Sequence, residues 1–337
     1  MECIIETVTT FDAQASVVDG TLASADLDNL IVVDVVGDGT ADTAVRTHRV
    51  DAALGQKLSA IMWEGPKETL TLTENAQPAL MAVSMAVMRV LEREKGFSLK
   101  DKVKFVAGHS LGEYSALAAA GAFSLADTAR LLKLRGQAMQ KAVPVGQGAM
   151  TALLGVGLDV AQKVAEAAAR PGGAGQEMGD VCEVANDNEP TQVVLSGHKT
   201  AIDRVAEVGK AFGVRRAVLL PVSAPFHCAL MQPAADAMAE ALSKVQINAP
   251  GVPVVANVLA SPISDPAEIR KRLVEQVTGT VRWRECTLYL ANNGITDIYE
   301  IGHGKVLAGL VKRIAKDASA ISVGAPADIE AARALLA

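Results

Sequence analysis

The chain has 337 residues, carries a net charge of −6 and is half hydrophobic. This length supports a large hydrophobic core and predicts two domains. No apolar run reaches the ~18 residues of a membrane span, no secretory signal is visible, and no basic patch with interleaved aromatic residues indicates nucleic-acid binding.

Cysteine and histidine are sparse and scattered along the chain. The four cysteines fit neither a disulfide framework nor a metal site, and the five histidines form no cluster with metal-ligand spacing. This pattern is typical of reduced thiols in a cytoplasm. We therefore expect a cytoplasmic protein without a metal ion.

The first fifty residues differ in composition from the rest. Residues 1–50 contain nine acidic and two basic side chains, whereas the remainder contains 29 acidic and 30 basic ones. All of the net negative charge therefore lies in this segment. Within it, residues 30–36 indicate a buried strand and residues 37–39 a turn. We interpret residues 1–50 as an atypical N-terminal segment.

From residue 51 helices and strands alternate. The pattern predicts helices at residues 54–62, 77–94 and 125–143, and a strand at 103–107. After a hinge at Gly146–Gly148, the order is β-α-β-β-α-β, which is typical of the ferredoxin-like unit. A strand at 254–258, a helix at 269–276, a strand at 297–301 and a helix at 306–315 follow.

Such alternation predicts a mostly parallel sheet that is covered on both faces. The expected fold class is therefore α/β. We predict an α/β-hydrolase-like large domain at residues 51–147 and 222–337. A ferredoxin-like small domain at residues 148–221 is inserted into it.

The motif Gly108-His-Ser-Leu-Gly112 lies between the strand at 103–107 and a helix-favouring segment. In that context Gly-x-Ser-x-Gly indicates a nucleophile elbow, in which Ser110 occupies a strained turn. The N–H of Leu111, the next residue, is the natural first donor to an oxyanion.

A serine nucleophile needs a base, and His227 is the best candidate. It lies in a loop stiffened by Pro221 and Pro225, after the small domain, so it can face Ser110 across the domain boundary. Arg135 is either a solvated helix charge or a bidentate clamp for a substrate carboxylate.

Six stretches carry a resemblance to a known family, and they occur in the family's order. They are residues 73–80, 108–113, 135–140, 185–192, 221–231 and 300–307. From about residue 51 onward, over about 85% of its length, the chain resembles the malonyl-CoA:acyl-carrier-protein transacylases of fatty-acid synthesis.

The resemblance implies a ping-pong reaction. Ser110 takes the malonyl group from malonyl-CoA with His227 as base, and the phosphopantetheine thiol of an acyl carrier protein then receives it. Arg135 is implied as the partner of the malonyl carboxylate, and Phe226 as a bulky residue that leaves little room for an α-methyl group. We expect no cofactor, an acyl carrier protein as partner, no nucleic acid or membrane, and a monomer.

Three departures from the family pattern stand out. The family begins with a strand and a Gly-Gln-Gly-Ser-Gln-like loop whose glutamine helps to form the oxyanion hole, and residues 1–50 contain no such loop. Arg282 replaces a frequent glutamine at a position thought to orient the base, and His303 replaces a common proline. We therefore expect a missing sheet strand and a missing oxyanion donor, whose loss costs ~10²–10³ in rate.

One explanation is that residues 1 to about 49 derive from a shifted reading frame or a misplaced start. The coding DNA tests this hypothesis: absence of an alternative frame that encodes a Gly-Gln-Gly-like loop would contradict it.

Two alternative functions stay open. A serine esterase uses the same elbow, but generally with an acidic residue between serine and histidine in chain order, and no acid in that interval has supporting context. A catalytically impaired remnant would still bind an acyl carrier protein, through Arg215, Arg216, Lys312 and Arg313.

Overall fold

The computed structural model describes residues 2–6, 48–95, 97–169, 179–222, 224–325, 327–329 and 331–332. The strand predicted at residues 30–36 and the turn at 37–39 lie outside this part. Within the described ranges, no helix is both long enough and apolar enough to cross a membrane.

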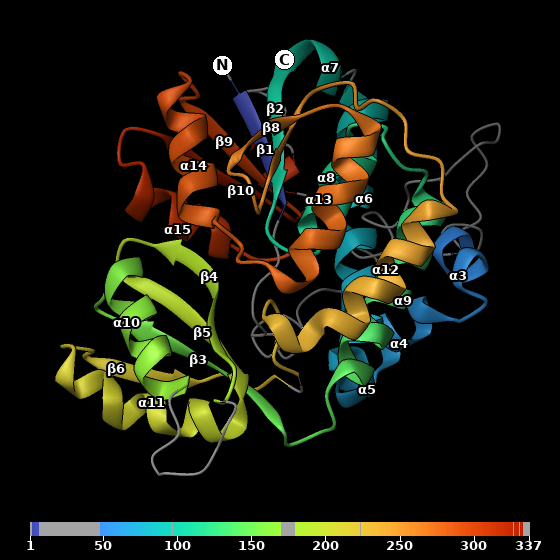
Figure 1. Cartoon of the computed structure of the whole chain (residues 1–337). Helices are drawn as coiled ribbons and strands as arrows, with labels where there is room; N and C mark the ends of the chain where they lie inside the picture. Colours follow the sequence, from blue (N-terminus) through green and yellow to red (C-terminus); the bar gives the residue numbers. More distant parts are fainter. Residues whose placement is uncertain are drawn as a thin grey trace.

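A six-stranded sheet forms the core of the larger domain (Figure 1). Its strands, in spatial order, are β10 (Ser319–Val323), β9 (Asp297–Ile301), β1 (Glu2–Glu6), β2 (Val103–Gly108), β7 (Val254–Ala256) and β8 (Ser261–Ile263). All neighbouring pairs are parallel except β7 and β8. The predicted α/β class with a mostly parallel sheet is confirmed.

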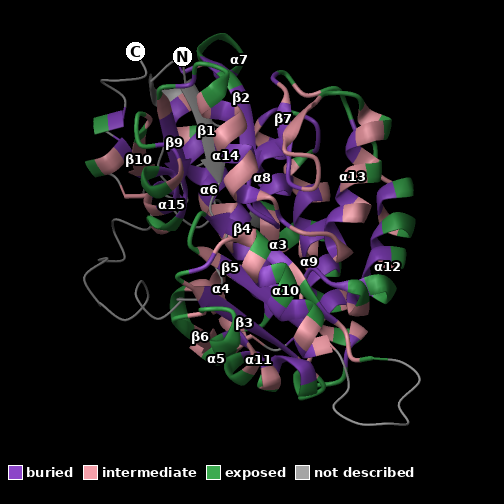
Figure 2. Ribbon diagram, turned by 60° about the vertical axis from the view of Figure 1, so that its left-hand side comes forward, coloured by how far each residue is buried: buried purple, intermediate pink, exposed green. Residues whose placement is uncertain are grey.

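Helices cover both faces of this sheet because its strands bury alternate residues on opposite sides. Val106 and Tyr299 face one core, and their neighbours Phe105 and Ile298 face the other. The first face carries α6 (Thr73–Lys95), α8 (Gly112–Ala119), α9 (Leu125–Ala142), α12 (Gln232–Ser243) and α13 (Pro266–Thr278). The second face carries α14 (Trp283–Asn292) and α15 (Val306–Ile314). Figure 2 shows buried residues along the strands and exposed ones on the outer side of α12.

Two helix predictions are wrong in their limits. The single helix expected at residues 54–62 is two helices, α3 (His48–Leu54) and α4 (Leu58–Glu64), because Gly55 has a φ of +61° and ends the first. The helix expected to start at Gln77 starts at Thr73, since the Leu72 carbonyl already accepts a hydrogen bond from the Ala76 N–H at 2.9 Å. Further short helices among the described residues are α5 (Lys67–Thr71), α7 (Leu99–Lys102) and the 3-10 turn η2 (Ala229–Met231).

The smaller domain has the predicted β-α-β-β-α-β order. Its elements are β3 (Gly148–Leu154), α10 (Leu158–Ala169), β4 (Cys182–Glu189), β5 (Gln192–His198), α11 (Lys199–Ala211) and β6 (Arg216–Leu219). The four strands form an antiparallel sheet in the order β4-β5-β3-β6, and α10 and α11 pack on it through one apolar core. This is the ferredoxin-like arrangement, whereas the exact domain limits stay predictions.

The expectation of a missing sheet strand in the N-terminal segment is wrong. Residues Glu2–Glu6 form β1, which lies in parallel between β2 and β9, near the middle of the sheet. Their apolar run is only three residues long, too short to stand out as a strand. The pairing partners, not the local pattern, define this strand.

Strand β4 joins the two domains. Asn186 forms a parallel bridge with Val281, and the Asp187 N–H donates to the Val281 carbonyl at 3.0 Å. The buried Asp187 carboxylate also lies 2.8 Å from Arg284 of α14. These contacts fix the small domain beside the large domain, on the side where Ser110 follows the carboxyl end of β2.

Candidate active site

Ser110 occupies a sharp turn between β2 and α8. Its φ is +54°, which is strained for a residue with a side chain. The turn requires glycine at position 108, because a Cβ there would lie 2.0 Å from the Gly112 carbonyl. Ser110 itself is buried, and it borders a small cavity.

The predicted nucleophile and base lie in contact. Ser110 Oγ is 2.7 Å from His227 Nε2, and His227 Nδ1 is 2.8 Å from the backbone oxygen of Gln276. Because that carbonyl can only accept, Nδ1 carries the proton and Nε2 is free to accept from the serine. Burial, and then the charge of Arg135, lowers the pKa of the His227 imidazole to about 3, so the ring is neutral at neutral pH.

The prediction that position 282 orients the base is wrong. The guanidinium of Arg282 instead contacts Glu285 and the carbonyls of Val258 and Leu259. Gln276, in the last turns of α13, supplies the carbonyl to His227. No local pattern in the sequence marks this role, because a backbone oxygen is present at every position.

Arg135 points from α9 into the same site and is fully buried. Its Nη2 lies 3.1 Å from Ser110 Oγ and 2.9 Å from Gln276 Oε1, and its Nη1 lies 2.9 Å from Gln77 Oε1. All three partners are neutral. Among the described residues no ion pair includes Arg135, and its Nε has no hydrogen-bond partner. The site therefore holds a buried positive charge with no carboxylate in contact, and the nearby Glu113 acts on it only from a longer distance.

Three buried polar residues that sequence reasoning missed surround Ser110. They are Glu113, Asn257 and Gln276. Asn257 Oδ1 accepts from the Ser110 N–H at 2.7 Å, and Gln276 Nε2 donates to the Ser110 carbonyl at 2.8 Å. The only available signal in the sequence was the position of Glu113, directly after the elbow motif.

His109, the neighbour of the serine, forms its side-chain hydrogen bond with the small domain. Its Nε2 lies 2.9 Å from Asn188 Oδ1 of β4, and its ring packs against Trp283. Burial lowers the pKa of the His109 imidazole to about 4.

The Leu111 N–H, predicted as an oxyanion donor, has no acceptor in the described part of the chain and is available for one.

A small cavity of about 70 Å³ opens onto the serine between the two domains. Arg135 and Phe226 line it from the large domain, and Met150 and Asn186 from the small one. Phe226, expected beside the acyl group, thus borders the space next to Ser110 and His227.

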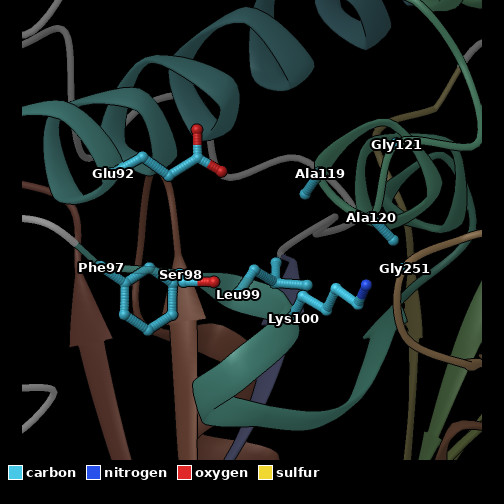
Figure 3. A pocket seen from close by; sticks show the side chains of 9 residues that line it. All are labelled: Glu92, Phe97, Ser98, Leu99, Lys100, Ala119, Ala120, Gly121 and Gly251. Carbon is cyan, nitrogen blue, oxygen red and sulfur yellow. The ribbon is translucent and has the colours of Figure 1, made fainter.

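A second hollow, of about 350 Å³, lies at the other end of α8 and is lined by Phe97, Leu99, Lys100 and Ala120 among others (Figure 3). It contains neither Ser110 nor His227. Among the described residues, no group of three or more histidine, cysteine or acidic side chains is arranged to hold a metal ion.

Comparison with known proteins decides the family. The model of the acyl transferase domain matches residues 40–328. The chain belongs to the acyl transferase domain family. The curated malonyl CoA-acyl carrier protein transacylase of Salmonella typhimurium is 44% identical over 281 residues, which are 83% of this chain and 87% of that protein. That of Bacillus subtilis is 42% identical over 84% of this chain and 85% of its own length.

Solved structures of family members agree with this assignment. The acyl-carrier-protein-S-malonyltransferase of Bartonella henselae is 55% identical, with a TM-score of 0.81 over 86% of this chain and 90% of its own. A type II PKS acyl-carrier protein in complex with its malonyl-transacylase gives a TM-score of 0.86 at 35% identity, over 99% of both chains. The resemblance inferred from the sequence is confirmed, and this acyl transferase is an enzyme of that family.

Proposed function

We propose that this acyl transferase moves a malonyl group from malonyl-CoA to the phosphopantetheine thiol of an acyl carrier protein, for fatty-acid synthesis. The observation that carries this proposal is the unpaired, buried Arg135 guanidinium 3.1 Å from Ser110 Oγ. Its relatives named malonyl CoA-acyl carrier protein transacylases support it.

The charge of Arg135 favours an acyl group that is itself an anion. A buried cation without an ion pair is costly, and a carboxylate that arrives with the substrate compensates it. A malonyl group carries its carboxylate one methylene from the thioester carbonyl. Arg135 can therefore fix the carboxylate while Ser110 attacks the carbonyl.

The first half-reaction forms a malonyl-serine. His227 Nε2 takes the Ser110 hydroxyl proton as Oγ bonds to the thioester carbon. The carbonyl oxygen becomes an oxyanion, which we assign to the Leu111 N–H. The carbon–sulfur bond then breaks, and the proton on His227 passes to the leaving coenzyme A thiol.

The second half-reaction reverses these steps with a new thiol. His227 takes the proton of the phosphopantetheine thiol, whose sulfur attacks the malonyl-serine carbonyl. The Ser110 ester bond breaks, and His227 returns the proton to Oγ. The neutral imidazole is required at the start of both halves, and its lowered pKa keeps it in that form at neutral pH.

All of the chemistry proposed here uses side chains and backbone of this chain, so we expect no cofactor beyond the thioester substrate. The expectations of a cytoplasmic, monomeric protein with no nucleic-acid or membrane partner stay part of this proposal.

The test is intact mass after mixing the purified protein with malonyl-CoA. We expect a malonyl-sized increase that is absent in Ser110→Ala, and transfer of that mass to an added holo acyl carrier protein. A folded wild-type protein that gains no mass would contradict the proposal and favour the impaired remnant. Release to water without transfer to the thiol would favour the esterase.

The remnant reading relies on four basic residues for carrier binding. One of them, Arg313, lies 3.0 Å from the Glu189 carboxylate of β4 and so bridges the two domains. Its charge is therefore partly compensated, which reduces what Arg313 can contribute to carrier binding in either function.

A further inference from the structure

The backbone of Ser110 is held on both sides by side chains from distant parts of the chain. Its N–H donates to Asn257 Oδ1 at 2.7 Å, and its carbonyl accepts from Gln276 Nε2 at 2.8 Å. A positive φ at a serine persists only where surrounding contacts enforce it. These two hydrogen bonds, with that of the Glu113 N–H to the same carbonyl at 3.2 Å, hold the Ser110 backbone here.

The Gln276 side chain and the Asn257 backbone meet at one carboxyl oxygen. Glu113 Oε2 accepts from Gln276 Nε2 at 2.8 Å and from the Asn257 N–H at 3.1 Å. All three residues are at most 1% exposed, so water does not compete for these bonds. Glu113 lies in the first turn of α8, only three residues after the serine, and moves with the elbow.

The contacts of Gln276 Nε2 with Glu113 and with the Ser110 carbonyl fix which way the amide faces. Because Nε2 points to the Glu113 carboxyl, Oε1 points to Arg135 Nη2 at 2.9 Å. A flipped amide would present N–H donors to the guanidinium donors. The backbone oxygen of the same residue holds His227. Gln276 therefore connects Glu113 to the base and to the arginine.

We propose that Glu113 is a positioning residue for acyl transfer, which acts through Gln276 and Asn257 to hold the nucleophile, the base and the arginine in register. This inference rests on the proposed function in taking Ser110 as the nucleophile. Glu113 itself touches neither substrate nor reacting atoms. The network depends on the position of the Glu113 carboxyl oxygen more than on its charge.

Two substitutions of Glu113 separate the position of its carboxyl oxygen from its charge. Glu113→Gln keeps the length and an acceptor oxygen but removes the charge, whereas Glu113→Asp keeps the charge but withdraws the oxygen by one methylene. Glu300→Gln is the matched control, because Glu300 is equally buried and its carboxylate accepts the Leu307 and Ala308 N–H groups at the start of α15.

The measurement is the rate of Ser110 acylation by malonyl-CoA, followed by intact mass at saturation and below it. We expect Glu113→Asp to lower the saturated rate by ~30–100-fold with less than a ~3-fold change in half-saturating concentration, since small misplacements of reacting groups have effects of this size. Glu113→Gln should stay within ~5-fold and Glu300→Gln within ~2-fold, even where their melting temperatures fall equally.

The inference would be overturned if Ser110 were acylated faster in Glu113→Asp than in Glu113→Gln. Acylation of Glu113→Asp at the rate of the parent would also overturn it. Labelling of Ser110 by a fluorophosphonate repeats the comparison without malonyl-CoA and should show the same order. A wild-type protein that reacts with the fluorophosphonate but not with malonyl-CoA would contradict the proposed substrate and leave the order of the variants to decide on Glu113.

Discussion

His227 Nδ1 lies 2.8 Å from the backbone oxygen of Gln276, so a peptide carbonyl and not a carboxylate orients the proposed base. A carboxylate in this place would stabilise the imidazolium and raise its pKa. The neutral carbonyl does not offset burial and the nearby Arg135 charge, and the pKa of His227 stays at about 3.

This arrangement predicts an acylation rate that is insensitive to mild acid. A base with an ordinary pKa near 6.5 would lose about tenfold in its neutral form between pH 7.5 and 5.5, whereas His227 remains neutral throughout. We expect the rate of malonyl-serine formation, at low malonyl-CoA, to change less than ~2-fold over this range.

One buried group complicates the profile, because burial raises the pKa of the Glu113 carboxyl to about 7. The control is therefore the same profile in Glu113→Gln, which removes that titration. A fall in acylation rate near pH 6.5 that persists in this variant would show that His227 titrates normally. It would contradict the prediction.

Arg135 should determine the preference for an anionic acyl group. In Arg135→Gln the malonyl carboxylate loses its charged partner, so we expect acylation by malonyl-CoA to fall ~10²–10³-fold relative to acylation by acetyl-CoA. The measurement is the ratio of the two rates by intact mass. Arg130→Gln, on the same helix but exposed and bound to Ala53 and Asp127, is the control and should leave the ratio unchanged. An unchanged ratio in Arg135→Gln would contradict the assignment.

Phe226 should restrict the space beside the acyl group. Phe226→Ala enlarges a cavity of only about 70 Å³, so we expect the rate with methylmalonyl-CoA to rise at least ~10-fold relative to malonyl-CoA, the value of one methyl group in a tight pocket. Competition between the two thioesters for Ser110 measures this directly. Phe212→Ala, on the outer surface of the small domain, should change nothing.

The elbow should tolerate no side chain at Gly108. A Cβ there would lie 2.0 Å from the backbone of Gly112, where neither partner can move without unwinding α8. We expect Gly108→Ala to lose more than ~3 kcal/mol of stability or to remain unfolded, as judged by thermal denaturation. Gly251→Ala, whose nearest neighbour would be 3.5 Å away, should melt like the parent. Equal melting temperatures for both variants would contradict the predicted collision.

Much of this protein was predictable because the signals are local. The elbow at Ser110 depends on glycines two residues to either side, and the β-α-β-β-α-β order depends on periodicity within each element. Both the elbow and the order of the elements can be recognised without knowledge of distant contacts. His227 and Arg135 were candidates from the residues themselves, and the family resemblance added Phe226. The structure brings all three to one cavity.

The sequence by itself therefore determined the fold class, the order of the elements and the candidate nucleophile, all of which follow from short-range patterns. Only the tertiary structure decided that Glu2–Glu6 complete the sheet, that Gln276 holds His227 across 49 positions, and that Asn257 holds Ser110 across 147. These relationships are hydrogen bonds of backbone atoms, or of amides that resemble many others along the chain. Their meaning arises only from the groups that packing places beside them.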